Sequence, residues 1–278
     1  MLMDLLIPLL PKNDLSHAVG RIVHKKLPGP IGRKSVEIFA RYYDINLDEA
    51  EHALEYYPTI GALFTRKLKE GLRPVANGIV HPADAVITEA AAIKDMQLIQ
   101  AKNRTYSVAG LLGGGPYVDR FHDGNFATYY LCPTDYHRVH SPVDGQIIWS
   151  NHIPGALWPV NDWSTEKIPD LFNINERIVV VIQTERGLVA LVMVAATNVG
   201  NMSMTFDSKI STRIRKGDRR PQPKNYEPPL KISRGDEVGI FHMGSTVVML
   251  YGPGVIQGDI SKLKGAQTRF GAGLEILT

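Results

Sequence analysis

The sequence predicts an α+β fold that is mainly antiparallel β, with a barrel- or sandwich-like domain behind N-terminal amphipathic helices. From about residue 75 onward, short runs rich in β-branched and aromatic residues alternate with Gly, Pro, Asn and Asp. This pattern is typical of strands joined by turns. No long helical run separates these strands, which favours an antiparallel arrangement over a Rossmann-type fold. Before residue 60 the apolar residues recur at helical spacing instead.

The predicted strands are short and end at turn residues. They lie in GIVHPADAVITEAAAI, QLIQA, FATYYLCP, GQIIWSN, ERIVVVIQTERGLVALVMVAAT, GNMSMTF and STVVMLYGPG. TERG at 184–187 separates two valine-rich runs and predicts a hairpin. Residues 213–231 are charged and proline-rich, so we expect an exposed loop there.

Helices are predicted over residues 14–26, 33–43 and 47–57. The first 36 residues hold six Lys or Arg against two Asp, so the basic excess lies at the N-terminus. Short basic amphipathic helices either pack on the domain behind them or lie in a membrane interface, with Lys and Arg toward anionic headgroups. The residues alone leave both interpretations open, because every packed helix also has an apolar stripe.

Composition argues against several classes of function. A net charge of +3 over 278 residues is too weak to indicate nucleic-acid binding. The single cysteine, Cys132, excludes an intrachain disulfide and a multi-cysteine zinc site. No run reaches the ~18 apolar residues of a spanning helix. The apolar opening stretch lacks the basic start and cleavage site of a secretory signal.

The stretch FHMGSTVVML, residues 241–250, holds Gly244, Ser245 and Thr246 inside a strand-like run. Glycine within a strand usually marks a bulge or a close approach of two backbones. A second interpretation is nucleophilic catalysis by Ser245, with His140 as the base and Asp84 orienting the imidazole. The G-x-S-x-G pattern of many serine hydrolases is missing, since glycine directly precedes this serine.

A third interpretation makes the peptide bond before Ser245 the reactive group. The serine hydroxyl lies close to the Gly244 carbonyl carbon, so proximity favours an intramolecular N-to-O acyl shift. The resulting ester can eliminate across the Cα–Cβ bond of Ser245. Hydrolysis of the dehydroalanine then releases ammonia and leaves a pyruvoyl group at a new N-terminus.

His137 and His140 lie in DYHRVHSP, a segment that follows a strand and precedes a proline. Their separation of three resembles metal-ligand spacing on a helix, but no cluster of Cys or carboxylates completes a site. On a short extended segment the two rings point in different directions, which suits two separate tasks around one pocket. We therefore predict no metal.

Several stretches together resemble the phosphatidylserine decarboxylase proenzymes of the shorter bacterial, membrane-associated type, over nearly the full chain. They are ALFTRKLKEGLRPV, HPADAVIT, IQAKNRTYSVAGLLGG, YLCPTDYHRVHSPVDG, IPGALWPVN, NERIVV and MGSTVVML. Two positions depart from the family pattern: Met243 replaces the usual leucine, and Ala85 stands where many relatives have glycine. The change at Met243 conserves volume, and the change at Ala85 is mild.

The resemblance implies a role for each matching residue. Ser245 becomes a covalent pyruvoyl group, Gly244 ends a β chain of residues 1–244, and residues 245–278 form an α chain that pairs with it. Asp84 and His140 assist self-cleavage, and His137 serves decarboxylation. Phosphatidylserine then forms a Schiff base with the pyruvoyl ketone, loses CO2 and leaves as phosphatidylethanolamine. No dissociable cofactor is implied, because the pyruvoyl group supplies the electron sink.

The resemblance also implies a domain plan and a location. Residues 1–60 would form a helical membrane-contacting segment and residues 61–278 the catalytic domain. The enzyme would bind the anionic cytoplasmic face of the inner membrane as a peripheral protein, with a homodimer left open. Three alternatives remain from the residues alone: a serine hydrolase of an ester, a pyruvoyl decarboxylase of a soluble amino acid, and a non-enzymatic binding protein.

Overall fold

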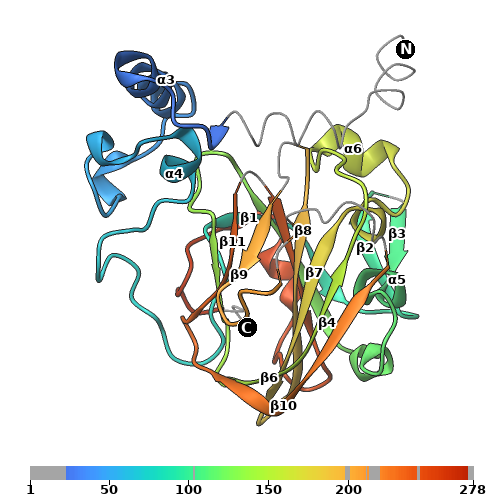
Figure 1. Ribbon diagram of the computed structural model, residues 1–278. Coiled ribbons are helices and arrows are strands. Elements are labelled where there is room, and N and C mark those ends of the chain that lie inside the picture. Colours follow the sequence, from blue (N-terminus) through green and yellow to red (C-terminus); the bar gives the residue numbers. More distant parts are fainter. Residues whose placement is uncertain are drawn as a thin grey trace.

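The computed structural model describes residues 23–102, 104–197, 201–210, 212, 220–242 and 245–274. Antiparallel strands make up most of the regular structure and short helices lie around them (Figure 1), which confirms the predicted α+β class. The helix predicted over residues 14–26 lies outside the described residues except at its end. Within the described part of the chain, no helix is both long and apolar enough to cross a bilayer.

The main sheet has eight strands. In spatial order they are β10 (Gln222–Ile232), β6 (Gly145–Ile153), β7 (Arg177–Thr184), β8 (Gly187–Ala195), β12 (Ser245–Tyr251), β4 (Asn125–Leu131), β1 (Ala85–Ala92) and β13 (Gln267–Thr268). All of the paired strands are antiparallel among the described residues. The two edge strands, β10 and β13, do not pair with each other, so this sheet is open and the described residues form no closed barrel.

A three-stranded sheet packs on the main sheet. Its order is β5 (Arg138–His140), β11 (Glu237–Phe241) and β9 (Met202–Met204). Gly239 of β11 comes so close to the main sheet that an added Cβ would lie 2.9 Å from the Met193 sulfur of β8, and it would also lie 2.9 Å from the Ser203 carbonyl oxygen of the neighbouring β9. Glycine is therefore the residue that allows this close packing.

Short elements complete the fold. The helices are α3 (Gly29–Tyr42), α4 (Ile60–Phe64), α5 (Val108–Leu112), α6 (Asp162–Lys167) and α7 (Leu171–Ile174), and a hairpin pairs β2 (Gln97–Ala101) with β3 (Arg104–Ser107). The 3-10 turns are η2 (Leu47–Glu49), η3 (Leu54–Tyr56), η4 (Val118–Phe121) and η5 (Ile260–Leu263). Figure 1 places β2, β3, α5 and α6 on one side of the main sheet and β9 and β11 on the other.

Strands β7 and β8 form the predicted valine-rich hairpin, and nearly all of their residues are buried. Strands covered on both faces read as continuous apolar runs instead of alternating patterns. Arg177 is the first residue of β7 and ties helices α5 and α7 to this strand. Its guanidinium donates to the carbonyl oxygens of Leu111, Gly110, Asn173 and Asn175 at 2.5–2.9 Å.

The N-terminal part of the structure has a small core of its own, made by Val36, Ala40, Ile45 and Leu63. The predicted helix over 33–43 is confirmed as α3, which begins four residues earlier at Gly29. The predicted helix over 47–57 is wrong. Glu51 and Lys69 donate backbone hydrogen bonds to Lys67 and Glu49, so this segment pairs in an extended form and leaves only the turns η2 and η3.

The exposed loop predicted over residues 213–231 is also partly wrong. Residues 222–232 form the edge strand β10, which pairs with β6 across an irregularity between Asn225 and Leu230. An edge strand tolerates the prolines of this segment because one of its sides needs no hydrogen-bonding partner. Residues 213–219 lie outside the described residues.

Candidate active site

The predicted cleavage site lies where the chain leaves one sheet and enters the other. Strand β11 ends at Phe241 in the three-stranded sheet, and β12 begins at Ser245 in the main sheet. The Phe241 amide donates to the His137 carbonyl oxygen at 3.0 Å, which ties the end of β11 to the histidine segment. Gly244 and the side chain of Ser245 lie outside the described residues.

The backbone of Ser245 is held on both sides. It pairs with Leu131 of β4 and with Ala195 of β8, so the new N-terminus that cleavage would create begins an interior strand. Directly after Leu131 the chain turns, and the Cys132 amide donates to the Asp135 carboxylate at 2.7 Å. Burial raises the pKa of Asp135 to about 6. A carboxyl group that titrates close to neutral pH therefore lies near the strand that holds Ser245.

His137 is fully buried and neutral. Its Nδ1 lies 2.8 Å from the Asp135 carbonyl oxygen, which can only accept, so Nδ1 carries the proton. The ring packs on Phe64 with 3.9 Å between ring centroids, and Nε2 has no hydrogen-bonding partner among the residues that the structure describes. Burial, and to a smaller extent the charge of Arg66, lower the pKa of His137 to about 3, although the hydrogen bond to the Asp135 carbonyl opposes this shift. Nε2 therefore offers an unused lone pair at physiological pH.

His140 uses both ring nitrogens. Nδ1 donates to the Gly235 carbonyl oxygen at 2.8 Å, so Nε2 is the acceptor for the Tyr136 hydroxyl at 3.1 Å. The ring stacks on Phe270, with centroids 3.8 Å apart and an interplanar angle of 11°. Burial lowers the pKa of His140, which leaves the ring neutral. An unprotonated Nε2 is what a general base requires, and Tyr136 occupies it here.

Asp84 and His140 both contact Phe270 and do not hydrogen-bond to each other. One carboxylate oxygen of Asp84 accepts from the Phe270 amide at 2.8 Å, and the other pairs with Arg73 at 2.7 Å. Arg73 also pairs with Glu49 at 2.7 Å, so the carboxylate belongs to an ion-pair network. The negative charge of Asp84 is one of the effects that oppose the lowering of the His140 pKa by burial. The structure thus couples the two residues through charge and through Phe270.

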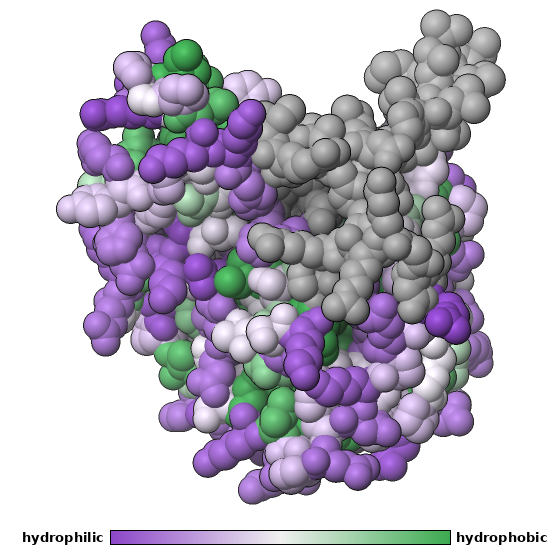
Figure 2. Space-filling model, viewed as in Figure 1, coloured by the Kyte–Doolittle hydropathy of each residue, from purple (hydrophilic) through white to green (hydrophobic). Residues whose placement is uncertain are grey.

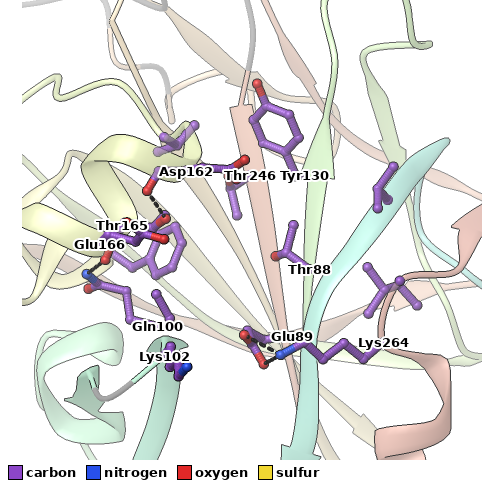
Figure 3. Close-up of a pocket in the computed structure, with 16 residues that line it drawn as sticks. Thr88, Glu89, Gln100, Lys102, Tyr130, Asp162, Thr165, Glu166, Thr246 and Lys264 are labelled. Carbon is purple, nitrogen blue, oxygen red and sulfur yellow. Dashed lines mark hydrogen bonds and ion pairs between the residues drawn. The ribbon is translucent and has the colours of Figure 1, made fainter.

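A pocket of about 360 Å³ opens beside Thr246, the residue after Ser245 (Figure 3). Thr246 pairs with Tyr130 across the sheet, and both line this pocket. Figure 3 shows the Glu89–Lys264 ion pair at its far end, with Nζ to Oε1 at 2.7 Å. Strands β1 and β2 and helix α6 supply most of the remaining wall. Among the described residues, no group of three or more His, Cys, Asp or Glu side chains could hold a metal ion.

Comparison with known proteins identifies the family of this chain. The sequence model described as phosphatidylserine decarboxylase matches residues 60–275. The chain is 40% identical over 266 residues to a protein of Anaeromyxobacter sp. (strain K), which covers 95% of this chain and 94% of the relative. That relative is named phosphatidylserine decarboxylase proenzyme. The chain belongs to the phosphatidylserine decarboxylase family.

Two further relatives carry the same name. The Vibrio cholerae protein (strain ATCC 39541) is 39% identical over 268 residues and covers 94% of each chain. The Myxococcus xanthus protein is 36% identical over 276 residues, covering 98% of this chain and 97% of the relative. These matches confirm the family recognised in the sequence, and with it the prediction of an enzyme of the decarboxylase, or lyase, class.

Four side chains of the site were not singled out from the sequence: Arg66, Arg73, Tyr136 and Phe270. Phe270 and Arg73 are 186 and 11 residues from Asp84, and only the fold shows that both contact it. Tyr136 lies within the histidine segment and was available as a candidate. Arg66 lies in ALFTRKLKEGLRPV, a stretch that carried the family resemblance without a role for any residue.

Neutral His137 makes the fold sensitive to acid. The folded pKa of about 3 lies below the ordinary 6.5, so the unfolded chain binds a proton first as pH falls. The free energy of unfolding therefore carries no penalty from His137 above pH 6.5 and falls progressively as the pH drops toward 3. The test uses a Ser245→Ala background, so that every chain stays uncut. In that background the free energy of unfolding should fall by about 2 kcal/mol less between pH 6.5 and 4.5 in His137→Gln than in its parent.

Urea denaturation at several pH values measures this slope. The exposed His122→Gln variant is the control and should keep the slope of its parent. Parallel profiles for His137→Gln and the parent would show that His137 is not held neutral by the fold.

Proposed function

We propose that this chain converts phosphatidylserine to phosphatidylethanolamine and CO2, with a pyruvoyl group made from Ser245 by self-cleavage after Gly244. The observation that carries the proposal is the position of Ser245. Its backbone begins an interior strand, and the preceding segment is tied to His137. The family match and the proenzyme names of the relatives support both the reaction and the maturation step.

In the proposed self-cleavage the Ser245 hydroxyl attacks the Gly244 carbonyl carbon. His140 takes the hydroxyl proton at Nε2 once Tyr136 gives up this position or passes the proton on. Asp84 favours the protonated imidazole through its charge, as the electrostatic effect on His140 already indicates. Arg73 pairs with the Asp84 carboxylate at 2.7 Å and so balances its charge in a largely buried site. Elimination and loss of ammonia then complete the group.

The surroundings of position 245 fit such a group. A pyruvoyl carbonyl would supply the electron sink that amino-acid decarboxylation needs. Backbone bonds to Leu131 and Ala195 would hold its chain end in place. Neutral His137 would accept a hydrogen bond at Nε2 from the substrate amine, and a proton that reaches this atom would pass to the α-carbon after CO2 leaves. A pKa of about 3 keeps that protonated state brief and strongly acidic.

The two chains are proposed to stay together after cleavage. Residues 245–251 form β12 between β4 and β8, so the small chain is part of the middle of the main sheet. Its side chains Val247, Val248, Met249 and Leu250 are fully buried. Cleavage of the bond before Ser245 removes none of these contacts.

A membrane-contacting surface is proposed on α3. This helix has two apolar faces: Val36 and Ala40 are buried, whereas Ile31, Ile38 and Tyr42 are 66%, 58% and 79% exposed. The exposed three are spaced by seven and four residues, so they share one face. Packing on the domain explains only the buried face. Figure 2 shows hydrophobic residues at the surface of this helical end of the molecule.

Basic residues accompany this exposed face. Lys25, Lys26, Arg33, Lys34 and Arg41 lie on α3 or just before it. Apolar side chains that enter the headgroup region, with Lys and Arg beside them, are the pattern of an interfacial helix on an anionic membrane. We therefore propose a peripheral enzyme at the cytoplasmic face of the cell membrane, where a bilayer-resident substrate is available. Residues 1–60 are proposed as the membrane-contacting segment and residues 61–278 as the catalytic domain.

Release of CO2 from phosphatidylserine, and from free serine for comparison, tests the reaction. The wild-type protein should decarboxylate phosphatidylserine, and Ser245→Ala should lose at least about 10³-fold of the rate because no pyruvoyl group forms. The exposed Ser208→Ala variant should match the wild type. Turnover of free serine alone would move the assignment to a soluble amino acid, and activity of the uncut Ser245→Ala chain would remove the pyruvoyl mechanism.

Sedimentation with vesicles that contain phosphatidylglycerol tests the surface. Ile31→Glu and Ile38→Glu should each weaken binding by about tenfold, since each replaces an inserted apolar side chain with a charge of the headgroups' own sign. Ile99→Glu changes a partly exposed isoleucine on β2 and should bind as the wild type does. Equal binding by all three variants would assign α3 to contacts within the protein.

A further inference from the structure

Arg66 is a buried cation with unused hydrogen-bond donors. It follows α4, and only 5% of its surface is exposed. Its Nη2 donates to the carbonyl oxygens of Thr134 at 2.9 Å and Asp135 at 3.4 Å. Its Nε and Nη1 are buried and have no hydrogen-bonding partner among the described residues. Two donors of a charged group are therefore left without an acceptor in this part of the chain.

Such an arrangement is costly unless a ligand completes it. A guanidinium stays protonated in proteins, and each buried donor without a partner costs about 1–3 kcal/mol. Asp84, Glu49 and Asp135 are close enough to raise the Arg66 pKa against the effect of burial, yet none of these carboxylates forms an ion pair with it in the described structure. An incoming oxyanion would satisfy the donors and balance the charge.

Arg66 and His137 converge on one atom. The Asp135 carbonyl oxygen accepts from Arg66 Nη2 and from His137 Nδ1, so the two side chains lie within a few ångströms of each other. Phe64, two residues before Arg66, packs on the His137 ring. The end of α4 is also fixed, because the Thr65 carbonyl oxygen accepts from Arg138 of β5 at 2.9 and 3.0 Å.

The two side chains offer complementary functions. Arg66 presents unused N–H donors, and His137 presents an unused acceptor at Nε2. A ligand that carries an anionic oxygen and an ammonium group would satisfy both. We propose that Arg66 binds an anionic oxygen of the substrate head group and so positions the ammonium group at His137. This inference rests on the proposed function, and it adds a specificity-determining residue to it.

The head group carries two such oxyanions, a carboxylate and a phosphodiester, and they predict different kinetics. The phosphodiester keeps its charge throughout the reaction, so its contact with Arg66 stabilises ground state and transition state alike and acts on KM. The carboxylate loses its charge as CO2 leaves. A contact to it is weaker in the transition state than in the ground state, so removal of Arg66 changes kcat as well.

The location of α4 also suits a head group that arrives from a bilayer. Leu63 of α4 belongs to the small core that supports α3, the helix of the proposed membrane-contacting surface. Along the chain, Arg66 therefore lies between that surface and His137. In space, it shares the Asp135 carbonyl oxygen with His137.

Arg66→Gln tests the inference with short-chain phosphatidylserine as the substrate and short-chain phosphatidylethanolamine as an inhibitor. The product keeps the phosphodiester and lacks the carboxylate. A phosphodiester contact predicts that KM and the inhibition constant both rise by about tenfold or more while kcat stays within about twofold. A carboxylate contact predicts that KM rises with a changed kcat while the inhibition constant is unchanged.

Arg186→Gln, at the exposed tip of the β7–β8 hairpin, is the matched control and should behave as the wild type. KM and inhibition constant within about twofold of this control would overturn the inference. If Arg66→Gln does not mature, Arg66→Lys, which keeps a cation, takes its place. Failure of both variants to cleave would assign Arg66 to folding or self-cleavage and also overturn it. A wild-type enzyme without activity on phosphatidylserine would instead refute the proposed function.

Discussion

Strand β12 is hydrogen-bonded along both edges, to β4 on one side and to β8 on the other, and the arrangement of the candidate site depends on this position. Its first residue, Ser245, has a fixed backbone place beside Leu131 and Ala195. The residues just before it connect the two packed sheets. A reactive chain end at this point is held by the interior of the fold and needs no covalent link to residue 244 for its position.

Burial of neutral groups is the second constraint on the site. His137 and His140 are both held without charge, because burial opposes protonation and a backbone carbonyl fixes Nδ1–H in each. The difference between them lies at Nε2. In His140 this atom is occupied by the Tyr136 hydroxyl, and in His137 it has no partner within the described part of the chain. This asymmetry agrees with separate tasks for the two rings, one in self-cleavage and one in decarboxylation.

Charge in the site is concentrated in arginines that contact carboxylates or carbonyls. Arg73 balances Asp84 and Glu49, and Arg138 joins β5 to Glu237 of β11 while also fixing the end of α4. Arg66 differs from both because, among the described residues, it has neither an ion-pair partner nor acceptors for Nε and Nη1. These unused donors are what mark it as the proposed binding residue.

The sequence predicted the parts of the fold that depend on local pattern. The valine-rich runs and the TERG turn gave the β7–β8 hairpin, and apolar spacing gave α3. The helix over 47–57 failed because backbone pairing with residues 67–69 overrides local propensity, and such pairing has no signal in the sequence. The strand β10 was missed because prolines and charges are tolerated on a sheet edge, although they read as a loop.

The candidate site was predictable only in its residue types. Asp84, His137, His140 and Ser245 were recognised from motifs, but their contacts depend on the tertiary structure. Nothing in the sequence indicates that Phe270 contacts both Asp84 and His140, or that Arg66 shares an acceptor with His137. The extended segment from His137 to His140 did correctly suggest that the two rings face different surroundings.

Intact-mass analysis of the purified protein, under native and denaturing conditions, tests the central claim most directly. Under native conditions a single species should contain both chains, because β12 stays in the main sheet. In denaturant it should separate into residues 1–244 and residues 245–278, the small chain lighter by one ammonia than its encoded sequence. A single uncut chain that still decarboxylates phosphatidylserine would contradict the account.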